Sequence, residues 1–202
     1  MNFTEEDLEI IAKYHAEQIS NWDDEELKVL KSKIKEHLKT NFNEQCCYCK
    51  RGFEDEFNMV IDIEHILPKS KFRALTFDIK NLNLSCKRCN MKIKKERIDF
   101  LVDKINAYTN RYNPNNYLLI HPNLDIYKEN LNFINFTLDD EKFIKYIPLS
   151  AKGKFNYKYF YLDKIERSTF NLVQGTKNNL EFNSENIQFE IFEKLDNILK
   201  KM

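Results

Sequence analysis

The chain contains little glycine and little proline, with three glycines and four prolines in 202 residues. It also lacks low-complexity stretches and internal repeats, which excludes a repeat array and a long flexible linker. A chain of this length can bury a sizeable core. Both a single domain and a core with two appended lobes fit these observations.

An excess of charge of one sign is also missing, because 32 Lys and Arg residues balance 32 Asp and Glu residues. This excludes a protein whose whole surface is built to coat nucleic acid. The sequence has no apolar run long enough to span a membrane and no secretory signal-like segment. We therefore expect a cytoplasmic location, reduced thiols and no membrane partner.

Cysteine is present in an informative pattern, because Cys46/Cys49 and Cys86/Cys89 form two Cys-x-x-Cys pairs. Four thiolates suit tetrahedral Zn²⁺, and a closed four-thiolate site leaves no open position, so the zinc is predicted to be structural. Disulfides or free thiols are the alternatives, which a reducing compartment disfavours. Cys47 does not fit the pairing and is either a bystander or a substitute for a neighbouring ligand.

The segment between the two cysteine pairs predicts the order strand, loop, strand, helix. Residues 59–63 are rich in β-branched side chains and residues 83–85 precede Cys86, so both are predicted strands. Residues 90–96 contain no Gly or Pro and predict the first turns of a helix. His65 would then leave the first strand and Asn90 would open the helix, so both can face one cleft.

Residues 46–97 resemble the ββα-metal fold of HNH endonucleases. The resemblance rests on the two cysteine pairs, on Ile63-Glu64-His65-Ile66-Leu67-Pro68-Lys69-Ser70, and on Asn81-Leu82-Asn83-Leu84-Ser85-Cys86-Lys87-Arg88-Cys89-Asn90. More narrowly, these strings are similar to the HNH nucleases of Septu-type and retron-associated anti-phage systems. That narrower resemblance implies an ABC-type ATPase as a partner protein.

The family resemblance implies a role for each site residue. His65 matches the general base that deprotonates the attacking water, and Asn81 matches the asparagine that braces the loop and orients this histidine. Asn90 matches a metal ligand of the HNN variants, Glu64 matches the acidic metal ligand, and Asp62 matches a second acidic position. A neutral imidazole suits a base near pH 7. Carboxylate and amide oxygens suit one Mg²⁺ or Mn²⁺.

Basic residues far outnumber acidic ones between residues 66 and 97. A basic patch beside a site for phosphodiester cleavage fits phosphate binding, although a solvated helix face accounts for some of these side chains. No base-reading motif is present, so we expect little sequence readout. The predicted DNA contacts are Lys69, Lys71, Arg73, Lys87, Arg88, Lys92, Lys94 and Lys95.

The expected fold class is α+β, with three regions. Residues 1–41 are predicted to form a helical hairpin, with Thr4 and Asp23 as helix caps. Residues 42–100 are expected to form the zinc-stapled ββα core. Residues 101–202 are expected to form a mixed α/β region, which can pack with the core as one domain.

In the C-terminal region, residues 98–109 are predicted to be helical, and residues 133–138 and 143–147 are predicted to pair as a hairpin. Residues 154–162 are rich in Tyr and Phe. They are interpreted as packing surface, with base stacking as the alternative. Ser184 is predicted to cap a final helix.

Two functions from different classes follow. The first is a metal-dependent HNH endonuclease that hydrolyses phosphodiester bonds of DNA and serves anti-phage defence with an ATPase partner. The second is a zinc-stabilised nucleic-acid-binding or assembly module with an inactive HNH-like pocket. The sequence favours the first, because Glu64, His65, Asn81 and Asn90 are all present.

Overall fold

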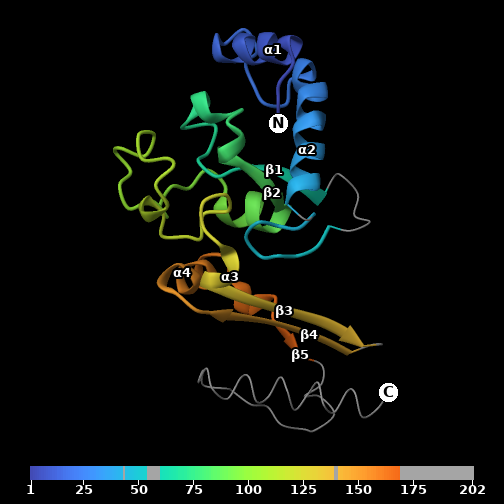
Figure 1. Cartoon of the computed structure of the whole chain (residues 1–202), viewed down its shortest axis with the longest axis vertical. Coiled ribbons are helices and arrows are strands. Elements are labelled where there is room, and N and C mark those ends of the chain that lie inside the picture. Colours follow the sequence, from blue (N-terminus) through green and yellow to red (C-terminus); the bar gives the residue numbers. More distant parts are fainter. Residues whose placement is uncertain (43, 54–59, 139–140, 169–202) are drawn as a thin grey trace. The chain divides into compact units, whose positions relative to one another are not determined.

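The computed structural model of the chain describes residues 1–42, 44–53, 60–138 and 141–168 (Figure 1). Residues Met1–Arg167 form one compact unit and Ser168–Met202 form a second. Short helices and small sheets alternate along the first unit, which confirms the predicted α+β class. The helix predicted after Ser184 lies outside the described residues. Within the described ranges, no helix is both long enough and apolar enough to cross a membrane.

The chain begins with two helices, α1 (Glu5–His15) and α2 (Lys28–Asn41). Thr4 caps α1 as predicted, because its hydroxyl accepts from Asp7 N and the Asp7 carboxylate accepts from Thr4 N. The predicted cap of the second helix is wrong by one residue. The Asp24 carboxylate, and not that of Asp23, accepts from a backbone N–H two residues on, which starts a 3₁₀ turn (η1, Glu25–Leu27) that runs into α2.

One face of α2 is buried against the central sheet. Leu30, Ile34 and Leu38 recur every four residues, so they share one helix face, and all three are fully buried. This face packs against β2, and Figure 1 shows α2 beside both strands of the sheet. The burial fixes α2 next to the segment that carries the predicted site.

The central sheet pairs β1 (Ile61–His65) with β2 (Leu82–Cys86) in antiparallel register, with His65 opposite Leu82. A π-helix, η5 (Arg88–Lys94), follows β2 directly. The predicted order of strand, loop, strand and helix is thus confirmed, with shifted boundaries. The first strand continues to His65, and the helix begins before the predicted Asn90.

The prediction of a helix over residues 98–109 is wrong. Val102 N donates to Asn116 O and Leu118 N donates to Phe100 O, so part of this segment bridges to a later one instead of forming helical hydrogen bonds. The Asp103 carboxylate accepts from Asn106 N and closes a local turn. Such side-chain bonds to the backbone compete with helical ones.

The predicted hairpin is confirmed as β3 (Leu131–Leu138) and β4 (Glu141–Pro148), with the short strand β5 (Arg167–Ser168) next to β4. Helices α3 (Tyr127–Asn130) and α4 (Ala151–Tyr159) flank the hairpin in sequence. The aromatic segment around α4 supplies packing surface, because Tyr159, Phe160 and Leu162 are buried. The remaining short turns are η3 (Arg73–Leu75), η4 (Ile79–Asn81), η6 (Pro114–Asn116) and η7 (Leu162–Lys164).

The C-terminal elements hold the first cysteine pair in place. Tyr146 of β4 donates its hydroxyl to Cys49 O at 2.6 Å, and Tyr127 of α3 donates to Tyr48 O at 3.0 Å. The Tyr48 ring stacks on Phe160 with 4.3 Å between ring centroids. The hairpin region therefore fixes the turn that presents two of the four predicted zinc ligands.

Candidate active site and zinc cluster

Four buried cysteines form one cluster at the base of the ββα core. The sulfur atoms of Cys46, Cys49, Cys86 and Cys89 all lie within 4.8 Å of one another. Cys49 Sγ lies 3.8 Å from Cys86 Sγ, far too long for a disulfide. Tetrahedral Zn²⁺ with Zn–S bonds of about 2.3 Å requires sulfurs about 3.8 Å apart. The donor set and its spacing therefore fit a zinc ion.

The first cysteine pair sits in a tight turn after α2. Lys50 N donates to Cys46 O at 2.9 Å and Cys46 N donates to Arg51 O at 2.8 Å. Lys50 has a positive φ of 56°, which closes the turn. The second pair links the end of β2 to η5. The cluster thus brings the turn before β1 and the junction between β2 and η5 together.

Cys47 lies outside this group of four. Its N–H donates to Leu84 O at 2.9 Å, and its side chain is buried. Burial raises the pKa of the Cys47 thiol well above its usual value. A buried neutral thiol in this position packs in the core, in agreement with its interpretation as a bystander.

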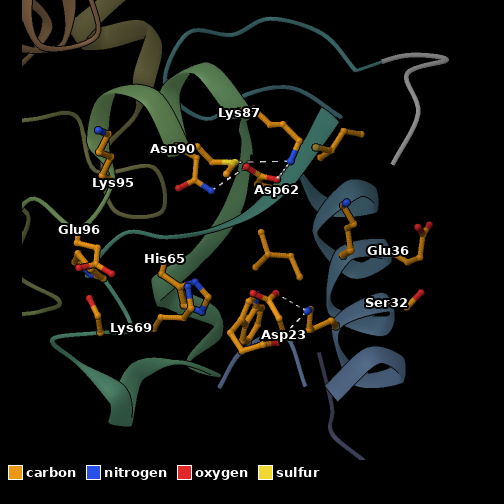
Figure 2. A pocket seen from close by; sticks show the side chains of 18 residues that line it. Asp23, Ser32, Glu36, Asp62, His65, Lys69, Lys87, Asn90, Lys95 and Glu96 are labelled. Carbon is orange, nitrogen blue, oxygen red and sulfur yellow. Dashed lines mark hydrogen bonds and ion pairs between the residues drawn. The ribbon is translucent and has the colours of Figure 1, made fainter. Parts of the chain in front are cut away.

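A pocket of about 740 Å³ lies between the ββα core and the N-terminal segment. Figure 2 shows Asp62, Lys87 and Asn90 grouped on one side with His65, and α2 with Ser32 and Glu36 across from them. Three of the predicted catalytic and metal-binding residues line this pocket together: Asp62, His65 and Asn90.

His65 ends β1 with only 7% of its surface exposed. Its Nε2 lies 3.1 Å from Thr76 O. Because a carbonyl oxygen only accepts, this bond assigns the proton to Nε2 and leaves Nδ1 as the basic nitrogen. Burial lowers the pKa of His65 to about 3, and the charges of Lys69 and Lys94 act in the same direction. The imidazole is therefore neutral at pH 7, with an unprotonated Nδ1.

Asn81 holds the loop that positions His65. Its Oδ1 accepts from Leu67 N at 2.8 Å, and its Nδ2 donates to Leu67 O and Leu75 O, both at 3.1 Å. Thr76, the hydrogen-bond partner of His65, directly follows Leu75. Asn81 is buried and does not line the pocket. Its contacts fit the bracing position that the resemblance implies.

Asp62 and Asn90 bring two oxygen-bearing side chains together. Asn90 Nδ2 donates to Asp62 Oδ2 at 3.1 Å, and Lys87 Nζ donates to Asp62 Oδ1 at 3.0 Å. The O and N of an amide are assigned from such contacts, so a rotated Asn90 would present its oxygen at the same place. One carboxylate and one amide oxygen, with space for water, fit the few protein ligands that Mg²⁺ uses.

Glu64 lies apart from this pair. It is fully buried, forms an ion pair of 2.7 Å with the buried Lys94, and accepts a hydrogen bond from the Tyr48 hydroxyl at 3.1 Å. Lys94 Nζ also donates to His65 O at 2.8 Å. Burial raises the pKa of Glu64, while Lys94 opposes the rise. Glu64 does not line the pocket, so the structure does not bring this predicted metal ligand to Asp62 and Asn90.

The predicted DNA-contacting residues divide into three groups. Lys69, Lys87 and Lys95 line the pocket, whereas Lys71 and Lys92 are exposed outside it. The other three have structural partners. Lys94 is buried with Glu64. Arg73 donates to Ile19 O at 2.8 Å with its guanidinium over the Tyr14 ring, and Arg88 donates to Tyr161 O at 2.8 Å. The Lys94 side chain is 1% exposed, so in this structure it is not placed to contact DNA.

The pocket residues missed from the sequence include Trp22, Lys31 and Lys35. They precede the cysteine pairs, in the segment predicted only to form a helical hairpin. The one local signal is that Trp22 is the single tryptophan of the chain. Their approach to His65 depends on the packing of α2 against the sheet, which no local pattern encodes.

Comparisons with known proteins agree with this geometry. Residues 46–96 match the family model described as HNH endonuclease. The Septu protein PtuB of Bacillus thuringiensis is 26% identical over 136 residues, which cover 67% of this chain and 43% of that protein. The chain thus spans less than half the length of this curated relative, and no solved structure matches. Residues 46–96 are therefore similar to HNH endonuclease domains, in a chain that is similar over 136 residues to a Septu protein.

Proposed function

We propose that this chain is a metal-dependent endonuclease that hydrolyses phosphodiester bonds of DNA. The observation that carries the proposal is the meeting of His65, Asp62 and Asn90 in one pocket. These are a neutral imidazole, a carboxylate and an amide, and they come from the end of β1, its middle and the helix η5.

His65 acts as the general base. With Nε2–H held by Thr76 O, Nδ1 takes the proton from the attacking water. Asn81 acts through the loop, because it fixes the backbone on which Thr76 lies. Both assignments follow the family resemblance and are supported by these contacts.

Asp62 and Asn90 would hold the catalytic Mg²⁺ or Mn²⁺. When bound there, the ion stabilises negative charge on the phosphate and on the leaving oxygen. Glu64 is assigned a different task, because its carboxylate is committed to Lys94 and Tyr48. We propose that the Glu64–Lys94 pair sets the backbone position of His65, since Lys94 also bonds to His65 O.

Two matched substitutions test this division of roles. Asp62→Asn should weaken Mn²⁺ binding and DNA cleavage while the melting temperature stays close to that of the parent. Glu64→Gln should lower the melting temperature while Mn²⁺ affinity, measured by isothermal titration calorimetry, changes little. If Glu64→Gln removed Mn²⁺ binding and Asp62→Asn did not, the carboxylate ligand would be Glu64.

We further propose that the chain serves anti-phage defence as a nuclease gated by an ABC-type ATPase partner. Similarity to the Septu protein PtuB and the resemblance of its motifs support this proposal. A cytoplasmic location fits the five free cysteines. Co-expression with an ATPase encoded beside it, followed by size-exclusion chromatography, is the test. Separate elution at micromolar concentration, together with full cleavage by the chain alone, would favour a free-standing nuclease.

A further inference from the structure

The N-terminal segment forms a second wall of the pocket, opposite the HNH residues. Trp22 precedes α2, while Lys31 and Lys35 lie on α2 itself, and all three line the same pocket as His65. The family match begins only at residue 46, so this wall lies outside the HNH domain.

Trp22 contacts the proposed general base directly. Its ring packs edge-on against the His65 ring, with 4.7 Å between centroids and 85° between planes. Two ammonium groups lie over the same indole: Lys31 Nζ is 5.1 Å and Lys69 Nζ is 5.8 Å from its centroid. One lysine comes from each wall of the pocket, so Trp22 gathers two positive charges beside His65.

The position of Lys31 is set by the backbone and leaves room for a phosphate. Its Nζ donates to Trp22 O at 2.9 Å and lies 3.5 Å from Asp23 Oδ1. The Asp23 side chain is 91% exposed, and an exposed ion pair at that distance contributes little to stability. A backbone phosphate can therefore replace Asp23 as the partner of Lys31 while the bond to Trp22 O remains.

Lys35 extends this positive wall toward the proposed metal ligands. Burial lowers the pKa of Lys35. The charges of Lys39 and Lys87 lower it further, whereas the charge of Asp62 raises it. Lys35 lines the same pocket as Asp62 and Lys87. Lys31 and Lys35, one helical turn apart on α2, thus place two basic side chains on this wall.

We propose that Trp22 and Lys31, together with Lys69 across the pocket, form a binding site for a nucleic-acid backbone phosphate next to the bond that is cleaved. This inference rests on the proposed nuclease function and assigns part of its substrate site to the N-terminal segment. Lys31 is a phosphate contact in this site. Trp22 is a positioning residue that holds the two lysines beside His65.

The single tryptophan makes the site directly observable. The 202-residue chain, loaded with zinc and kept in EDTA-free buffer without Mg²⁺ or Mn²⁺, is titrated with fluorescein-labelled DNA or RNA oligonucleotides. Anisotropy reports binding, and Trp22 emission reports occupancy of the site. We expect both signals to change at the same oligonucleotide concentration. Binding with no change in Trp22 emission would overturn the proposal.

Lys31→Gln and Lys28→Gln form a matched pair on the same helix, because Lys28 does not line the pocket. Lys31→Gln should weaken binding and reduce the slope of log affinity against log salt by about 1, as expected for one lost phosphate contact. Lys28→Gln should change neither. A variant that only distorts the pocket would bind more weakly with an unchanged slope of log affinity against log salt. A reduced slope therefore identifies the loss of the phosphate contact of Lys31.

The outcomes separate this inference from the nuclease proposal. If wild type binds and cleaves DNA and the Lys31 and Lys28 variants show equal salt slopes, the phosphate site is wrong and the nuclease proposal stands. If wild type neither binds nucleic acid nor cleaves it, with Mn²⁺ and the proposed ATPase partner added for the cleavage assay, both are overturned.

Discussion

Replacing Lys94 with methionine should destabilise the protein strongly, because it leaves the Glu64 carboxylate buried without its cation. The Lys94–Glu64 pair spans 2.7 Å, and the two side chains are 1% and 0% exposed. After the substitution, Glu64 keeps only the Tyr48 hydroxyl at 3.1 Å. Its Oε2 already has no partner among the described residues.

Two effects determine how much unfolding free energy Lys94→Met should remove: the cost of neutralising Glu64 and the loss of a hydrogen bond. Glu64 can avoid a buried negative charge by taking up a proton. Its ordinary pKa is 4.5. Holding such a group neutral at pH 7 costs about 3 kcal/mol, at about 1.4 kcal/mol per pH unit. The lost hydrogen bond from Lys94 Nζ to His65 O adds about 1 kcal/mol. We expect a total near 4 kcal/mol, within the range of about 3–5 kcal/mol for breaking a buried pair.

Guanidinium unfolding with zinc present measures this loss, and the melting temperature should fall by roughly 10 °C. Lys92→Met is the matched control, because Lys92 lies on the same helix and is exposed. The double variant Lys94→Met with Glu64→Leu should regain most of the stability, since both charges are then absent. If Lys94→Met cost no more than Lys92→Met, the pair would not support the core as argued.

Three further outcomes are expected. Cys86→Ser with Cys89→Ser should purify without zinc and unfold the core, because metal-binding free energy is folding free energy in such sites; retention of zinc in elemental analysis would contradict this. Asn81→Ala should cost about 2–4 kcal/mol in guanidinium unfolding, because it removes three hydrogen bonds from a buried loop; a loss under about 1 kcal/mol would contradict the bracing role. Burial lowers the pKa of His121 from 6.5 to about 4, so the stability that its neutral form contributes above pH 6.5 is lost as the pH falls to about 4. His121→Asn should reduce the acid-dependent loss of unfolding free energy by about 3 kcal/mol over that range; an unchanged pH profile would refute the assignment.

Local patterns were enough to predict the four-cysteine cluster and the order of elements in the ββα core. The two Cys-x-x-Cys pairs need only tight turns to present their sulfurs, and the four sulfur atoms do meet. The strand before His65 and the hairpin of β3 and β4 were likewise readable from alternating and β-branched residues.

The sequence did not allow a prediction of which distant residues pair with one another in the fold. Glu64 and Asp62 are both carboxylates of β1, and the fully buried one, Glu64, is paired with the buried Lys94 at the end of η5. Lys94 resembles its basic neighbours in the sequence, so its burial was missed. The role of Trp22 depends in the same way on how α2 packs. The helix predicted over residues 98–109 was wrong for a related reason. Backbone hydrogen bonds of Phe100 and Val102 go to residues 116 and 118.

The central claim is that His65 is the base of a metal-dependent nuclease, and plasmid cleavage tests it most directly. Wild type and His65→Ala, each carrying zinc by elemental analysis, are incubated with supercoiled plasmid and Mg²⁺ or Mn²⁺, alone and with the proposed ATPase partner. Wild type should cleave with metal and not with EDTA. His65→Ala should be slower by about 10²-fold or more, since a general base contributes about 10²–10⁴-fold. Cleavage by His65→Ala at the wild-type rate would contradict the account.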